Sequence, residues 1–182
     1  MSIGPEDILN FWFIEVGPDR WFAPDPALDA NVREKFLGIY EQATRGELSK
    51  WEETPEGTLT LLLLLDVFPR RMFRGTARAY SMDDQARELA RATIIKHFDD
   101  RIDRSYKLLF YLPFSHTENA GDQRLGVYYI RERTKEPDWI KMAEERQHII
   151  RRFGRFPHRN AALGRETTAE EAAYLAEAKE EP

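Results

Sequence analysis

Two arginine-rich stretches hold the side chains of this sequence that are best suited to binding an anion. Residues 70–78 contain four arginines and residues 146–165 contain six, and neither stretch contains an aspartate or a glutamate. Together they hold half of the twenty arginines, whereas the chain has only seven lysines. Because the guanidinium is planar and presents paired N–H groups, arginine suits ordered, two-pronged contacts with carboxylates and phosphates. The two stretches therefore indicate fixed ionic pairing.

Two interpretations of the stretches remain open. In the first, phenylalanines and arginines from both stretches line a groove that binds a carboxylate or a phosphate. In the second, the same arginines brace the fold by stacking on the phenylalanines and pairing with acids or with the carbonyls at helix ends. The available acids are Asp66, Glu118, Asp122 and the glutamates of the last helix. We expect the stretches to pack together as one arginine-rich wall, structural for most arginines, with a small anion site for the remainder. The candidates for the groove are Arg70, Arg74, Arg155 and Arg159.

The histidines suggest a second kind of chemistry. His116 and His158, together with Asp122, are the candidates for general acid–base catalysis of a hydrolase type, because imidazole titrates near neutral pH. A metal site is not expected, since no closely spaced pair of histidines such as HExxH is present and the chain has no cysteine. We expect no cofactor, because P-loop, nucleophile-elbow and Rossmann glycine patterns are all missing.

The distribution of charge argues against nucleic acid as a partner. The net charge is −5 and the isoelectric point is about 5.5. Residues 166–182 contain six glutamates and one lysine, so the rest of the chain is balanced. This acidic segment follows the second arginine stretch directly and competes with a phosphate backbone for the same positive surface. An anionic small molecule or an acidic peptide is the better expectation.

Composition predicts one soluble, cytoplasmic domain over residues 1–182, with 166–182 as an acidic C-terminal helix and tail. Hydrophobic residues make up 42% of the 182, which is enough for a sizeable core. The absence of cysteine fits a reducing compartment. The N-terminus lacks a signal-peptide pattern, and the longest apolar run, within 59–65, is too short to span a bilayer. The oligomeric state is not specified by the sequence.

Apolar residues recur with the 3.6-residue period of an α-helix through nearly the whole chain, which predicts an all-α fold of about eight helices in antiparallel pairs. The helix that begins at Thr54–Pro55 is apolar nearly all round, so we expect it to be central and buried. Proline should end two helices, at Pro69 and before Pro113. Ser81, Ser115 with Glu118, and Thr167 or Thr168 are the predicted N-terminal caps. The expected helices cover 28–43, 55–68, 82–94, 103–112, 116–133, 137–153 and 168–178, with a short turn after Pro157.

Three motifs resemble a known bacterial family. They read "LLDVFPRRMFRGTARAY", "YLPFSHTENAGDQ" and "RQHIIRRFGRFPHRNAALGRETTAEEAAYL". They are similar to the patterns of the family catalogued as domain of unknown function 924, and the likeness spans nearly the whole chain. The resemblance implies an all-helical fold like that of tetratricopeptide (TPR) proteins. It implies no activity, because the function of that family is not established.

The resemblance identifies matching positions in this sequence but assigns no role to the residues at those positions. Two departures alter the pattern, since Val67 stands where the family usually has glutamine and Arg71 where it usually has asparagine. If those amides contact a ligand in relatives, the site in this chain is more basic. Ser115 and Asn119 are milder changes. The matching residues are Arg70, Arg74, His116, Glu118, Asp122, Gln123, His148, Arg152, Arg155, His158, Arg159 and Asn160.

The sequence thus favours a helical binding module for an anionic small molecule or an acidic peptide, with a hydrolase and a purely structural role as alternatives. The predicted ligand-binding residues are Arg70, Arg74, His116, Asp122, Gln123, His148, Arg155, His158, Arg159 and Asn160.

Overall fold

The computed structural model describes residues 3–177, which are helical with turns and contain no strand. Contacts divide the chain into two compact units. Unit 1 comprises the residues up to Arg74 together with Arg78–Ile102, and unit 2 comprises Gly75–Ala77 and the residues from Asp103 onwards. The predicted all-α class is confirmed, whereas the single-domain organisation and the TPR-like stacking stay predictions. None of the helices in residues 3–177 has the length and apolar character that crossing a bilayer requires.

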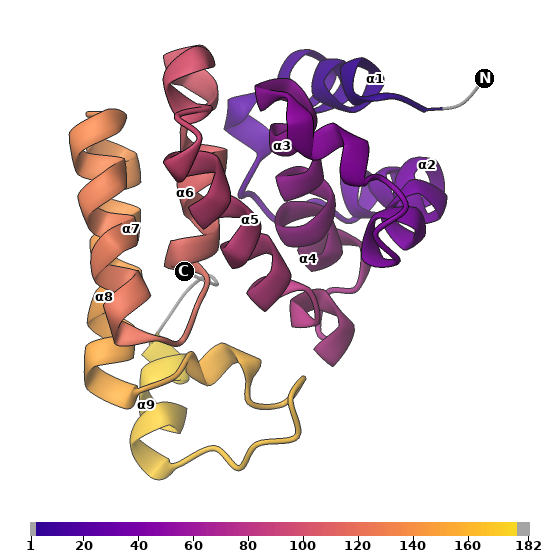
Figure 1. The fold of residues 1–182 in the computed structure, drawn as a ribbon. Helices are drawn as coiled ribbons and strands as arrows, with labels where there is room; N and C mark the ends of the chain where they lie inside the picture. The colour runs from indigo at the N-terminus through magenta and orange to yellow at the C-terminus, as the bar shows by residue number, and fades with distance from the viewer. Residues whose placement is uncertain (1–2, 178–182) are drawn as a thin grey trace. The chain divides into compact units, whose positions relative to one another are not determined.

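Unit 1 is built around one continuous apolar helical stretch. Every residue from Gly57 to Pro69 is buried, which confirms the predicted central helix. Thr54 caps its start by accepting the Gly57 N–H, as expected. Figure 1 shows this stretch among the other helices of the unit. The α-helices of unit 1 are α1 (Pro5–Asn10), α2 (Pro26–Thr44), α3 (Pro55–Leu62), α4 (Phe68–Met72) and α5 (Asp83–Ile95), and π-helical segments cover Phe11–Val16 and Leu63–Val67.

The prediction that Pro69 ends the central helix was wrong. The chain passes from α3 through the π-helical segment directly into α4, and the Phe68 N–H donates to the Leu63 carbonyl five residues back. The wider turn places Pro69 in the first turn of α4. The π-helical segment changes the hydrogen-bond pattern of the turn that a proline would otherwise disrupt, so the chain stays helical through Pro69.

Unit 2 contains three helices that lie side by side in Figure 1, followed by a fourth helix. Short connections join the three, and each packs against the other two. Pro137 opens the third helix and Gly154 closes it in the left-handed conformation with φ of 72°, as predicted. The helices are α6 (Leu108–Ser115), α7 (Ala120–Arg133), α8 (Pro137–Phe153) and α9 (Ala169–Glu177), and 3₁₀ turns cover Pro18–Arg20, Ser49–Glu53, Ala77–Tyr80, Asp99–Arg101, Arg104–Tyr106 and Pro157–Arg159 of the chain.

Three boundary predictions in unit 2 were wrong, and the first is the start at 103, because α6 begins at Leu108. Pro113 lies inside α6, which continues to Ser115 and is buried along its whole length. The helix expected from 116 begins at Ala120, because the Asn119 side chain accepts the N–H groups of Gly121 and Asp122. Ser115 therefore caps nothing. The predicted end at Ala178 lies outside the described residues.

Two further caps can be compared with the structure. In unit 1, Ser81 does not cap α5, because Met82 occupies the cap position and the Ser81 hydroxyl donates to the Arg78 carbonyl. In unit 2, Thr168 was the correct choice for α9, since its hydroxyl accepts the Glu171 N–H.

Replacing Leu62 by proline should destabilise the protein by at least ~3 kcal/mol. Leu62 is 1% exposed and lies in the last turn of α3. Pro69 follows a π-helical segment, whereas Leu62 follows ordinary α-helical turns. Urea unfolding followed by circular dichroism measures the loss.

Leu62→Met is the matched control, because it keeps the volume and should cost less than about 1.5 kcal/mol. Equal stability of the two variants would show that this stretch does not need its helical hydrogen bonds.

Candidate functional site

The arginines of the first stretch are paired within unit 1. Arg70 donates both terminal nitrogens to the Asp83 carboxylate, at 2.9 and 2.8 Å, and also contacts Asp66 at 3.1 Å. Arg74 donates to Asp29, and Arg78 pairs with Glu41. These contacts satisfy the second interpretation of the stretch, in which arginine braces the fold.

Arg71 is the most deeply placed arginine of this stretch. Its side chain is 4% exposed, and it contacts the Asp29 carboxylate at 2.8 Å. It also donates to the carbonyls of Arg20, Trp21 and Ala23. Arg71 therefore braces the segment before α2, and the departure from the family pattern adds no exposed positive charge here.

Burial and the neighbouring carboxylates shift the pKa values of Arg70 and Arg71 in opposite directions. Burial works to lower the pKa of Arg70, but the carboxylates of Asp66 and Asp83 outweigh it and raise that pKa above its ordinary value. For Arg71 burial prevails over the Asp29 contact, and its pKa is lowered. Both groups stay charged at physiological pH.

Glu118 holds the second arginine stretch in place, although the two lie far apart in the sequence. Its carboxylate accepts the Phe156 N–H at 2.7 Å and two N–H groups of Arg165 at 2.7 and 2.9 Å. Burial raises the pKa of Glu118, but Arg165 and the Phe156 N–H outweigh burial and lower it overall. Glu118 is therefore not the capping-box acid that the sequence suggested. It is the anchor of the segment after α8.

Glu171 is the second anchor. It is 2% exposed, and its carboxylate accepts two N–H groups of Arg155, at 2.6 and 2.9 Å. The Thr168 N–H and the Asn160 side chain donate to the same carboxylate. The hydrogen bonds, led by those from Arg155, lower the pKa of Glu171 to about 2. Arg165 donates to the side-chain amide oxygen of Asn160 and so links the two anchors.

The remaining predicted residues of unit 2 lie on several elements. Gln123 is buried in α7 and donates to the carbonyls of Ser115 and Thr117. Arg159 is 6% exposed, donates to the His116 carbonyl and stacks on the Phe156 ring. The latter ring also contacts His158. His116 follows α6 directly, Asp122 lies in the first turn of α7, and both are buried.

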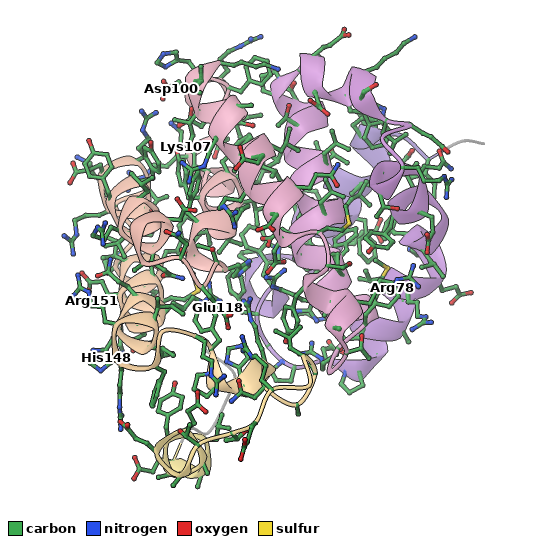
Figure 2. All side chains as sticks on the ribbon, turned by 60° about the horizontal axis from the view of Figure 1, so that its bottom comes forward. Arg78, Asp100, Lys107, Glu118, His148 and Arg151 are labelled. Carbon is green, nitrogen blue, oxygen red and sulfur yellow. The ribbon has the colours of Figure 1, made fainter. Side chains whose placement is uncertain are left out.

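Exposed positive charge gathers at the end of α8. His148, Arg151 and Arg152 are spaced three and four residues apart, which places them on one side of the helix. All three are exposed, and Figure 2 shows the labelled His148 and Arg151 at the outer edge of this helix. Within residues 3–177, neither His148 nor Arg151 has an acidic partner. We call these three residues and Arg155, which follows the helix, the α8 basic end.

Arg151 was absent from the residues predicted to bind a ligand. The signal that could have identified it is the helical spacing from His148 through Arg151 and Arg152 towards Gly154. The position also has a structural benefit, because cations near a helix C-terminus interact favourably with the helix dipole by about 0.3–1 kcal/mol.

This arrangement can bind carboxylates, and it does so within the chain itself. In the described residues, no cluster of three or more histidine or acidic side chains is arranged to hold a metal ion. The expectation that the protein uses no metal or cofactor stays a prediction. The candidate acid–base residues His116, Asp122 and His158 all belong to unit 2. The predicted wall formed by both arginine stretches also stays a prediction.

Comparison with known proteins identifies relatives without a known activity. The profile of a bacterial protein family of unknown function, DUF924, matches residues 8–179. The chain is similar to a solved structure of a protein of unknown function from Agrobacterium tumefaciens, with 42% identity and a TM-score of 0.90. That alignment covers 96% of this chain and 97% of the other. No curated protein sequence matches the chain.

The Glu171 anchor should make stability depend on pH in the acidic range. The pKa of this carboxyl is about 2 in the folded protein against an ordinary 4.5. Its stabilising effect is therefore complete above about pH 4.5 and lost as the pH falls towards 2. Glu171→Gln should lower the urea midpoint at pH 6, and the gap to the native protein should narrow as the pH approaches 2.

Glu170→Gln is the control for this measurement, because Glu170 pairs with Arg152 but is 64% exposed in its side chain. Exposed pairs contribute little, so this variant should follow the native curve. A gap for Glu171→Gln that stays constant from pH 6 to 2 would refute the anchor.

Proposed function

The chain belongs to the bacterial family DUF924, whose function is unknown, and we propose that it is a cytoplasmic binding protein for acidic peptides. The observation that carries the proposal is the two-pronged contact of Arg155 with Glu171, a carboxylate on a helix. It supplies an example, within the chain, of how the α8 basic end recognises an acidic side chain. The absence of cysteine supports the cytoplasmic location.

Unequal use of the arginines supports this location for the site. Arg70, Arg71 and Arg74 are committed to acids of unit 1. At the α8 basic end, by contrast, His148 and Arg151 are exposed and have no acidic partner among residues 3–177. A ligand can therefore reach them without breaking an ion pair within residues 3–177.

A peptide fits this surface better than a small anion does. Arg152 is exposed at the end of α8, and Phe153 is half-buried beside it with its ring against Tyr174. A peptide can meet the charges and the aromatic ring together, whereas phosphate or a dicarboxylate uses the charges alone. The TPR-like stacking of helices belongs to the same proposal. The hydrolase alternative that uses His116, Asp122 and His158 stays a prediction from the sequence.

Tetraglutamate should bind the native protein and raise its melting temperature at low ionic strength, because a ligand that binds only the folded state stabilises it. Arg151→Ala should weaken that binding about two- to fivefold, as expected for one exposed charge pair. Isothermal titration calorimetry at 20 and 200 mM salt measures the affinity, which should fall with salt.

Two controls separate a site from general electrostatic attraction. Lys50→Ala removes the same charge from an exposed position in unit 1 and should leave the affinity unchanged. Tetraglutamine should not bind. Equal weakening by both alanine variants, or the absence of tetraglutamate binding, contradicts the proposed function, and binding of phosphate with the same Arg151 dependence assigns the site to small anions.

A further inference from the structure

Helix α9 is attached to unit 2 in an unusual way. It has nine residues, and its only buried residue is the carboxylate-bearing Glu171. Tyr174 is half-buried and packs on the cluster formed by Ile149, Ile150 and Phe156. A short helix normally docks through a buried apolar stripe. Here the deepest contact is instead an ion pair with an arginine.

The docking contacts of α9 fall on the α8 basic end. Glu171 holds Arg155, and Glu170 contacts Arg152 at 2.9 Å. Arg155 also donates to the Glu166 carbonyl in the segment that leads into α9. Two of the four residues of the α8 basic end are thus covered by α9, whereas His148 and Arg151 are not.

We propose that α9 occupies the peptide site of its own chain, and that an acidic helical peptide with the same sequence pattern displaces α9 from it. This inference rests on the proposed function and adds its regulation. The α9 segment shows what the partner must contain, because each element of its pattern makes a contact. Thr168 and Glu171 form a reciprocal capping box, and the same carboxylate receives the arginine fork. Tyr174, one turn later, lies against Phe153.

The partner is therefore a helix that begins with Thr-x-Glu-Glu-x-x-Tyr or an equivalent sequence. Such a peptide gains the contacts that α9 gives up. A helix of this length is marginal in free solution, so the exchange costs the protein little more than the docking contacts of α9. Because the main contacts of α9 are ionic, added salt should weaken its attachment to the peptide site.

Hydrogen exchange in the native, full-length protein provides the first test. The probe is a peptide of residues 166–177 with phenylalanine in place of Tyr174, so that its fragments differ in mass from those of the protein. Adding it should speed amide exchange in 169–177 and leave α7 and the first turns of α8 unchanged. Binding of the probe without faster exchange in 169–177 overturns the displacement.

Two variants with the same loss of charge provide the second test. Glu171→Gln weakens the internal contact and should increase the affinity for the probe about tenfold over the native protein. Glu177→Gln is the matched control, because Glu177 lies on α9, is exposed and has no charged partner among residues 3–177. It should bind the probe as the native protein does. Equal affinity of the two variants overturns the inference.

The outcomes distinguish this inference from the proposed function. In one outcome, tetraglutamate binds through Arg151, but the probe does not displace α9 and does not bind Glu171→Gln more tightly than the native protein. That outcome supports the acidic-peptide site and contradicts its regulation by α9. If neither ligand binds, both fall. If Glu171→Gln does not fold, the exchange measurement on the native protein decides alone.

Discussion

The fold of the chain beyond α8 depends on two carboxylates that are shielded from water and therefore need hydrogen-bond donors from the protein. Glu118 and Glu171 are acids drawn from outside the arginine-rich segment, and each is held by several N–H donors. Shielding a carboxylate from water costs free energy unless hydrogen-bond donors replace the water, so the loss of any one donor destabilises the whole arrangement. This interdependence fixes a segment in which Phe156 is the only fully enclosed aromatic ring. It accounts for two of the five arginines that lie within residues 151–165, because Arg155 pairs with Glu171 and Arg165 with Glu118.

The sequence predicted what is decided locally and missed what is decided at long range. Pro137, Gly154 and Thr168 act within one turn of themselves; the first two were placed correctly, and Thr168 was one of the two predicted caps. Glu118 stands three residues after Ser115, which imitates a capping box, yet its partners are Phe156 and Arg165, 38 and 47 residues away. No local pattern reveals such a pairing. The sequence indicated that Glu118 and the glutamates of the last helix were available to the arginines, but it did not predict which arginine pairs with which acid.

The two prolines show a different limit. Helix-breaking by proline follows from a lost hydrogen bond and a clash with the preceding turn, and both costs apply to an ordinary α-helical turn. The π-helical segment Leu63–Val67 changes the turn before Pro69, and buried packing holds α6 through Pro113. These are tertiary solutions, available only because both stretches are buried. Whether a proline ends a helix depends on how exposed the stretch is, and the sequence pattern alone did not predict that exposure here.

A basic stretch becomes evidence for binding only after the charges committed to the fold have been removed from it. In unit 1 the pairs with Asp29, Asp66 and Asp83 account for Arg70, Arg71 and Arg74. In unit 2, Arg165 is committed to Glu118, and both acids that meet Arg152 and Arg155 lie on α9. That difference matters, because α9 is a short helix with no buried apolar residue, whereas Glu118 lies between two packed helices. The acids of α9 are therefore the ones that a competing carboxylate can replace, and the arginines they would release lie at the end of α8.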